Sequence, residues 1–396
     1  MSKYWERALL LALVGYATLL VLHILIHPEV YQWDFRGYYQ CATAFRSGIN
    51  PYDTQAVTQM AGAELLPFVY PPLTLFAFLP FTYCEYALAY SGYLFLKVVV
   101  LAGLIYLWST AFLSRRTDYL FYALCLFGFN ATIFVDLQSG NISLFEQYGL
   151  WLAFLFYLRR CYGLFSGVIV ATALFKVQPV FFLCLLLVVP GARRWRHLVI
   201  SLAAFLGVLA LEYVLAPALF SGFIANAGNT MNEEGIKNPS TFSLARQVLA
   251  ASAEALDLPP LAGIYYFVHG VIAVCIVGVS WRATRKLYDT PVQDKAIWLV
   301  GLGCCVFALI SVRFKDYSYM TLIVPAYLVF ERAVVDKKVL LVALASFSAA
   351  RVTLPGVVEV APFWWSYYPL LIAFGVWYLY IRTIHSPVRP HQAQPQ

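Results

Sequence analysis

The chain has 396 residues, of which 62% are hydrophobic and only 12% charged, and its formal net charge is +7. A soluble globular domain carries charge on about a quarter of its residues, so this composition excludes an ordinary soluble protein. Basic residues gather in short gaps between apolar runs, which is typical of cytoplasmic loops, so the positive charge reports membrane topology and predicts no nucleic-acid partner. These clusters are Arg115/Arg116, Arg159/Arg160, Arg193/Arg194/Arg196, Arg282/Arg285/Lys286 and Lys337/Lys338.

The first apolar run, at about residues 7–27, predicts a retained membrane helix, because it is too long for a cleaved signal and no small-residue cleavage site follows it. The segment 28–67 then forms the first extracytoplasmic loop, which is long enough to hold short amphipathic helices. The next stretch, from Tyr70 to Trp108, fits either two crossings or a half-helix and one crossing. Keeping the arginines at 115–116 in the cytoplasm favours a half-helix over 70–82.

Crossings at about 117–135 and 142–158 follow, and then the chain turns back within the membrane. Residues 161–191 lie between two arginine clusters that both belong in the cytoplasm, so this segment must reverse near Phe175 to Pro179. Each arm has about 14 residues, roughly 21 Å of helix, which is less than the hydrocarbon thickness of about 30 Å. The reversal should therefore be recessed from the outer surface.

The rest of the chain predicts a second, polar extracytoplasmic loop over 218–260 and further membrane helices. These crossings lie at about 198–217, 261–280, 295–311, 318–331, 339–351 and 364–381. We expect about twelve crossings in total, both termini in the cytoplasm and a single transmembrane domain over 1–396. The fold class is therefore an all-α, multi-pass protein of the cell inner (plasma) membrane.

Charged and polar residues at outer membrane depth are the informative departures from this pattern. Each charge costs about 2.5–3.5 kcal/mol on insertion scales unless it faces a polar cavity. The predicted threading brings all of them to the extracytoplasmic side. They are Asp34 with Arg36, Asp136 with Gln138 and Glu146, Lys176, and Arg313 with Lys315 and Asp316.

Lys176 has two interpretations. Its ammonium group can snorkel to the surface from a helix end. Alternatively, Pro179 begins the second arm, and the free amide groups of that arm face the same recess as Lys176 and Gln178. The second arrangement suits a phosphate buried below the outer surface.

Arg313 and Lys315 stand at an outer helix end, against the positive-inside trend. They can form an internal ion pair with Asp316, or they can hold a phosphate or diphosphate group together with Lys176. A soluble anion needs no site within the bilayer, whereas a lipid phosphate does. The position therefore favours a lipid-linked ligand.

Asp34 follows the first membrane helix among aromatic residues. It can act as the amino-terminal cap of a short helix, or as a general base whose pKa an apolar setting raises. The aromatic faces of Trp33, Tyr38 and Tyr39 are suited to a sugar or lipid. Asn50 to Asp53 predicts a turn with a structural role.

The remaining titratable residues predict little chemistry. Glu146 fits a buried, hydrogen-bonded acid that ties two helices together. The six histidines show no ligand spacing, so we expect no metal site, no cofactor and no hydrolase triad. The eight cysteines are scattered, and nearly all lie in apolar runs, which predicts no disulfide framework.

Several short motifs, in this order, resemble glycosyltransferase family 87. They are Asp34-Phe35 with Tyr38-Tyr39, Gly48-x-x-Pro51-Tyr52-Asp53, Tyr70-Pro71-Pro72, a Gly140-Asn141 turn, and Phe175-Lys176-x-Gln178-Pro179. The resemblance runs from about residue 30 to 330. It implies a GT-C fold and an activity like that of the polyprenyl-phosphate-mannose-dependent α-mannosyltransferases in the family.

The resemblance also implies roles for residues. Asp34 would be the catalytic base, and the outer basic groups would hold the lipid phosphate of the donor, with inversion and no metal. The donor-phosphate residues are then Lys176, Gln178, Arg313 and Lys315, and the sugar or lipid contacts are Trp33, Tyr38, Tyr39 and Asn141. Family members often carry a histidine before the late helix, whereas this chain reads Lys315-Asp316-Tyr317.

The sequence therefore predicts a transferase that moves a sugar from a polyprenyl-phosphate donor to a lipid or glycan acceptor on the outer face. The first alternative is a transporter or flippase of lipid-linked sugars, and a second is a non-catalytic scaffold that would leave the embedded charges unexplained. Alternating access should place functional charges on both sides of the membrane. Here they cluster on the outer side, which favours an enzyme.

Overall fold

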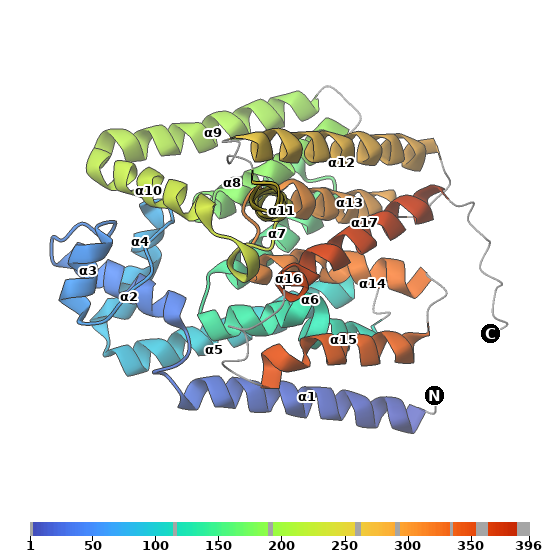
Figure 1. The fold of residues 1–396 in the computed structure, drawn as a ribbon, viewed down its shortest axis with the longest axis horizontal. Helices are drawn as coiled ribbons and strands as arrows, with labels where there is room; N and C mark the ends of the chain where they lie inside the picture. The colour runs from blue at the N-terminus through green and yellow to red at the C-terminus, as the bar shows by residue number, and fades with distance from the viewer. Residues whose placement is uncertain are drawn as a thin grey trace.

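The structure is a computed structural model, and it describes residues 3–113, 117–188, 193–257, 263–289, 294–332, 336–353 and 363–385. All regular secondary structure in this part of the chain is helical, as Figure 1 shows, which confirms an all-α polytopic membrane protein. The first-half α-helices are α1 (Lys3–Ile26), α2 (Trp33–Arg46), α3 (Thr54–Ala61), α4 (Leu73–Phe78), α5 (Tyr86–Leu107), α6 (Tyr119–Ser139), α7 (Ser143–Leu158) and α8 (Tyr162–Ala173). The second-half α-helices are α9 (Arg193–Leu215), α10 (Pro217–Asn229), α11 (Thr241–Ala255), α12 (Ile264–Asp289), α13 (Lys295–Ile310), α14 (Ile323–Arg332), α15 (Lys337–Thr353), α16 (Phe363–Ser366) and α17 (Tyr368–His385).

Short helical turns join several of these helices. Four are important for the site: η3 (Gln178–Val188), η4 (Thr230–Asn232), η5 (Gly235–Lys237) and η6 (Asp316–Leu322). Two others flank α5, namely η1 (Leu79–Tyr83) and the π-helical turn η2 (Trp108–Phe112).

Five described helices are long and apolar enough to cross a bilayer. They span Tyr4–Ile26, Tyr86–Phe112, Tyr119–Ser139, Arg194–Leu215 and Ile264–Asp289. Each coincides with a predicted crossing, and the predicted crossings at 295–311 and 364–381 fall on shorter apolar helices, Lys295–Ile310 and Tyr368–Ile384. The total of about twelve crossings stays a prediction.

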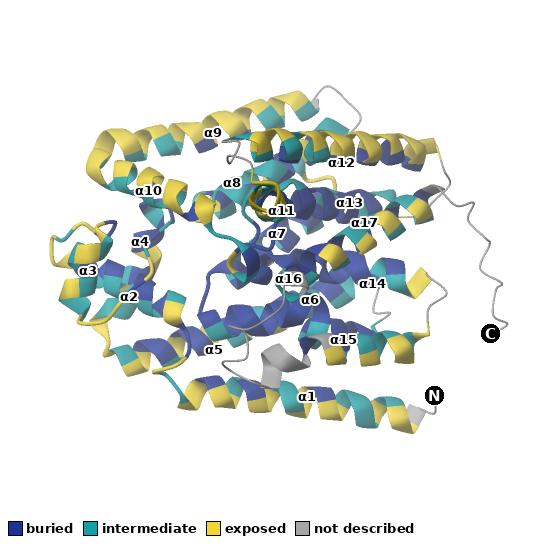
Figure 2. Ribbon diagram, in the orientation of Figure 1, coloured by how far each residue is buried: buried dark blue, intermediate teal, exposed yellow. Residues whose placement is uncertain are grey.

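Burial separates central from peripheral helices (Figure 2). α6 and α13 are largely buried, whereas α1, α9 and α12 bury few of their apolar side chains. In a lipid solvent an exposed apolar face is stable, and the helix satisfies its own backbone groups. We infer that these peripheral helices face lipid and that α6 and α13 form the core.

α6 is interrupted inside the core. Phe129, Asn130 and Ala131 all adopt positive φ angles, of 51°, 62° and 56°, directly after Gly128. The second half of α6, from Thr132 to Ser139, therefore runs as a separate short helix. It packs against η6, where the Thr132 hydroxyl donates to the Asp316 carbonyl at 2.6 Å.

The predicted reversal over 161–191 is confirmed as a hairpin. α8 and η3 pack against each other, and residues 174–177 form the turn between them. The second arm, η3, is a 3₁₀ helix. The first arm is about 18 Å long and the second about 22 Å, so neither reaches the hydrocarbon thickness of about 30 Å. α4 with η1 is likewise too short to cross, since its 11 residues extend no further than about 22 Å, which favours the half-helix interpretation of 70–82.

The two ends of the bundle differ. In Figure 1 the start of α1 and the end of α17 lie at one end, and α2, α3 and α4 lie at the other. The predicted first outer loop does contain two short helices, α2 and α3. Arg115, Arg116 and residues 258–260 at the end of the second predicted loop lie outside the described residues.

Candidate functional site

A close approach between α2 and the end of α6 builds the site. Gly140 ends α6 with φ of 69°, and a Cβ there would lie 2.9 Å from the Cβ atoms of Gln32 and Phe35, so only glycine fits. The Gln32 amide donates to the Gln138 carbonyl at 2.5 Å across this contact. Asn141, the next residue after Gly140, is thereby held against the first turn of α2.

Asp34 lies inside the first turn of α2, which begins at Trp33. The residue before the helix is Gln32, and it provides no side-chain cap, so the cap interpretation of Asp34 is wrong. Asp53, in contrast, caps α3 by accepting the Ala56 amide at 3.0 Å. The predicted turn before it is confirmed, since the Asn50 side chain accepts the Tyr52 amide at 3.0 Å.

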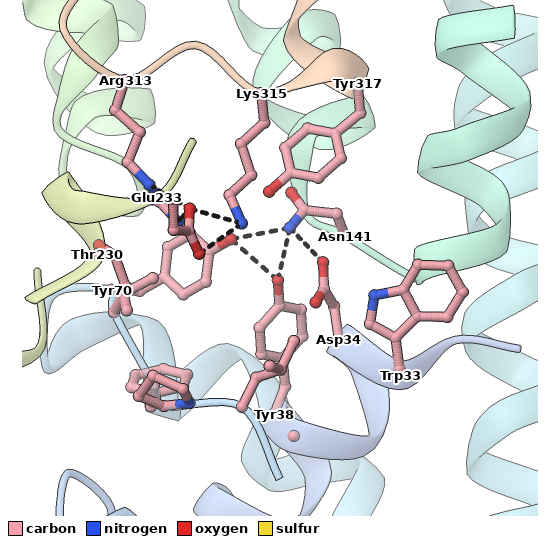
Figure 3. Close-up of a pocket in the computed structure, with 15 residues that line it drawn as sticks. Trp33, Asp34, Tyr38, Tyr70, Asn141, Thr230, Glu233, Arg313, Lys315 and Tyr317 are labelled. Atoms are coloured by element: carbon pink, nitrogen blue, oxygen red, sulfur yellow. Dashed lines mark hydrogen bonds and ion pairs between the residues drawn. The ribbon is translucent and has the colours of Figure 1, made fainter. Parts of the chain in front are cut away.

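The Asn141 side chain is the centre of a buried hydrogen-bond network (Figure 3). Its Nδ2 donates to Asp34 Oδ2 at 2.7 Å and lies 3.0 Å from the hydroxyls of Tyr38 and Tyr70. Its Oδ1 accepts the Ser143 amide at 3.0 Å and the Ser143 hydroxyl at 2.8 Å. Every polar atom of this amide thus has a partner, which fixes its orientation.

Two cations share an acid across from Asp34. Arg313 Nη2 lies 2.9 Å and Lys315 Nζ 3.1 Å from Glu233 Oε2. The predicted alternative paired them with Asp316, whereas the acid they contact here is Glu233, in the connection between η4 and η5.

Asp34 and these cations line one cavity, which encloses about 490 Å³ of atom-free space with its open mouth included. Figure 3 shows the side chains converging on it from α2, from the turn after α6 and from the segment before η6. The lining residues are Trp33, Asp34, Gly37, Tyr38, Leu66, Pro67, Phe68, Val69, Tyr70, Asn141, Thr230, Glu233, Arg313, Lys315 and Tyr317.

Burial raises the pKa of the Asp34 carboxyl above its ordinary value, and the positive charge of Lys315 is the largest opposing influence. The hydrogen bond from Asn141 and the charges of Lys97 and Arg313 also act to lower the pKa of Asp34, and they offset part of the effect of burial. A carboxylate in such a setting is a stronger base than an exposed one.

The other predicted phosphate residues lie behind the cavity wall. Lys176 Nζ donates to Ser143 Oγ at 2.7 Å and contacts Glu146 Oε2 at 2.5 Å, so it points inward and does not snorkel. Gln178 Nε2 donates to the Arg313 carbonyl at 2.7 Å. Glu146 is buried and ties α7 to the turn after α8, as the sequence suggested.

Two polar residues near Asp34 point elsewhere. The Tyr39 hydroxyl donates to the Cys84 carbonyl at 2.9 Å, away from the cavity. Arg36 donates to the carbonyls of Pro28 and Glu29, at 3.0 Å each, and so anchors the segment before α2.

Sequence reasoning missed several residues of the site. Lys97, fully buried in α5, lies 2.7 Å from Asp136 Oδ2 and donates to the carbonyls of Asp136 and Asn141. A lysine in the middle of an apolar span was a usable signal, because it demands a buried partner. Glu233 and Ser143 gave no such local signal.

These features define a class: a multi-pass helical membrane protein with an acid and two cations around one cavity. Residues 68–312 match the model of glycosyltransferase family 87, which is more than half of the chain. The chain belongs to glycosyltransferase family 87 and is therefore a membrane glycosyltransferase. No curated protein and no solved structure matches it. Asp34 lies before the matched region, and Arg313 and Lys315 lie just after it.

Proposed function

We propose that this chain is a GT-C-type enzyme of the cell inner membrane that transfers a sugar from a polyprenyl-phosphate-linked donor to a lipid or glycan acceptor on the extracytoplasmic face. One observation carries the proposal: Asp34, Arg313 and Lys315 line the same cavity. The acid can take a proton while the cations hold a departing phosphate. Mannose is the first sugar to test, by resemblance alone.

In the proposed reaction, the acceptor oxygen attacks the anomeric carbon of the sugar, and Asp34 takes the proton of the acceptor hydroxyl. The bond between the anomeric carbon and the phosphate oxygen breaks, and polyprenyl phosphate leaves with the bonding electrons. Attack from the side opposite the phosphate inverts the anomeric centre. Arg313 and Lys315 stabilise the leaving phosphate, so the step as written needs no metal.

Trp33, Tyr38 and Asn141 line the cavity and are the proposed contacts to the sugar or lipid. Trp33 is 42% exposed, so an apolar ligand surface can reach it. Tyr317, in the region where family members often carry a histidine, also lines the cavity. We propose that it contacts the donor.

A transporter or flippase of lipid-linked sugars is the alternative function, since the same cations would bind its cargo. Such a protein would need no base beside the phosphate site. The pairing of Asp34 with Asn141 next to Arg313 and Lys315 favours the transferase.

The Asp34→Asn variant tests the function. The purified protein would be assayed with polyprenyl-phosphate-mannose and a membrane-extract acceptor, with donor binding measured separately. We expect the variant to bind donor and to lose about 10²–10⁴ in transfer rate, because an amide cannot accept the proton. Asp53→Asn is the matched control, since Asn also caps a helix well, and it should transfer normally. Near-normal transfer by Asp34→Asn would remove Asp34 from the mechanism and favour the transporter.

A further inference from the structure

A chain of three hydrogen bonds joins Lys176 to Asp34 through two buried side chains. Lys176 Nζ to Ser143 Oγ is 2.7 Å, Ser143 Oγ to Asn141 Oδ1 is 2.8 Å, and Asn141 Nδ2 to Asp34 Oδ2 is 2.7 Å. Ser143 and Asn141 are both buried, so water does not compete for these bonds.

The direction of each bond follows from counting protons. An ammonium group only donates, so the Ser143 oxygen must accept from Lys176. The single hydroxyl proton of Ser143 is then free to be donated to Asn141 Oδ1, and the Ser143 backbone amide donates to the same oxygen. With its oxygen held by two donors, Asn141 presents its NH₂ group to Asp34.

The opposite orientation would have a different chemical effect. An Asn141 flipped by 180° would bring its carbonyl oxygen to Asp34, and two acceptors can share a hydrogen bond only if the acid is protonated. A protonated Asp34 cannot accept the proton of an acceptor hydroxyl. The orientation of Asn141 therefore decides whether Asp34 is available as a base.

We propose that Lys176 is a positioning residue that strengthens the hydrogen bond from Asn141 to Asp34, and so favours the ionised acid, by directing the Ser143 hydroxyl onto Asn141 Oδ1 beside the Ser143 backbone amide. This inference rests on the proposed function, because it assigns Lys176 a part in the same reaction. It differs from the sequence prediction that Lys176 binds the donor phosphate. The ammonium is already engaged by Ser143 and Glu146, and Arg313 and Lys315 remain in the cavity for the phosphate.

Other charged and titratable groups around Asp34 also influence its protonation, and the test must hold them constant. These groups are Tyr38 on α2, Tyr70 before α4, Tyr93 and Lys97 on α5, Asp136 on α6, and Arg313, Lys315 and Tyr317 in the segment that leads into η6. Ser143→Ala removes the relay and leaves all of these groups, and Lys176, in place. This variant separates the relay from a direct charge effect of Lys176.

The experiment measures the pH dependence of kcat and the donor dissociation constant for Ser143→Ala and Lys176→Met. Transfer by the wild type should rise with pH as Asp34 ionises and fall as pH drops through its raised pKa. The Ser143 backbone amide still orients Asn141 in both variants, so losing the directed hydroxyl weakens the hydrogen bond from Asn141 to Asp34 without removing it. The acidic limb of both variants should therefore move upward by about half a pH unit, with donor binding unchanged. Ser143→Thr, which keeps the hydroxyl, should restore the wild-type limb.

Ser166→Ala is the matched control, because it removes a buried hydroxyl from α8 that plays no part in the relay. If Lys176→Met weakens donor binding while Ser143→Ala behaves as wild type, Lys176 is a phosphate ligand and the relay is refuted. Unshifted limbs in both variants refute it as well. If Lys176→Met does not fold, the comparison of Ser143→Ala with Ser143→Thr decides the question. Failure of the proposed function is a separate outcome, seen as a wild type without transfer or an active Asp34→Asn.

Discussion

Replacing Lys97 by methionine should destabilise the protein strongly, because it breaks an ion pair that is fully enclosed. Lys97 and Asp136 are both 0% exposed, and their charged atoms lie 2.7 Å apart. Removing one partner of a buried pair costs about 3–5 kcal/mol, since the other charge stays buried without compensation. Methionine is similar in length and keeps most of the packing, so the loss reports the charge and not a cavity.

The same substitution removes two further bonds. Lys97 donates to the carbonyls of Asp136 and Asn141 at 2.6 and 2.7 Å, and both are at the end of α6 where the site begins. The double variant with Asp136→Asn removes both charges at once and leaves these two carbonyls and the neutral amide at position 136 without the Lys97 ammonium as a partner. We therefore expect its loss to be smaller than the sum of the single losses, by about 2 kcal/mol.

The measurement is a double-mutant cycle by SDS-induced unfolding, followed by tryptophan fluorescence. Wild type, Lys97→Met, Asp136→Asn and the double variant would be compared in one detergent. Additivity to within about 0.5 kcal/mol would refute the reasoning, because it would mean that the two side chains do not interact in the folded state. A Lys97→Met protein as stable as wild type would refute it more directly.

Two further predictions concern the cations and the topology. Glu233→Gln should tighten donor binding by roughly three- to ten-fold, since the phosphate would no longer compete with a carboxylate for Arg313 and Lys315. A donor titration measures this. Weaker binding would mean instead that Glu233 holds the two cations in place. The topology can be tested in single-cysteine variants with a membrane-impermeant thiol reagent. The reagent should label the exposed Cys84 on intact cells, and the exposed Cys161 only after permeabilisation. The reverse pattern would place the site in the cytoplasm.

The amino-acid sequence by itself determined the class of the fold. Membrane helices are encoded by local apolar runs, and a cytoplasmic end by nearby arginines, so both can be predicted without knowing how the helices pack. The recessed hairpin at 161–191 followed from length and charge in the same way. Asp34, Arg313 and Lys315 were also recognisable, because a charge beside an apolar run is costly unless something binds it.

Only the tertiary structure decided which of these residues meet. Asp34 and Asn141 are 107 positions apart and Arg313 and Glu233 are 80 apart, so neither contact leaves a periodic signal in the sequence. The packing of α2 against Gly140 brings the first pair together, and the connection between η4 and η5 brings the second. The tertiary structure also turns Lys176 toward Ser143 and Glu146 and away from the cavity. A lysine in a recess pairs with the nearest buried acid. Because that acid is on α7, its location depends on how α7 packs against the hairpin.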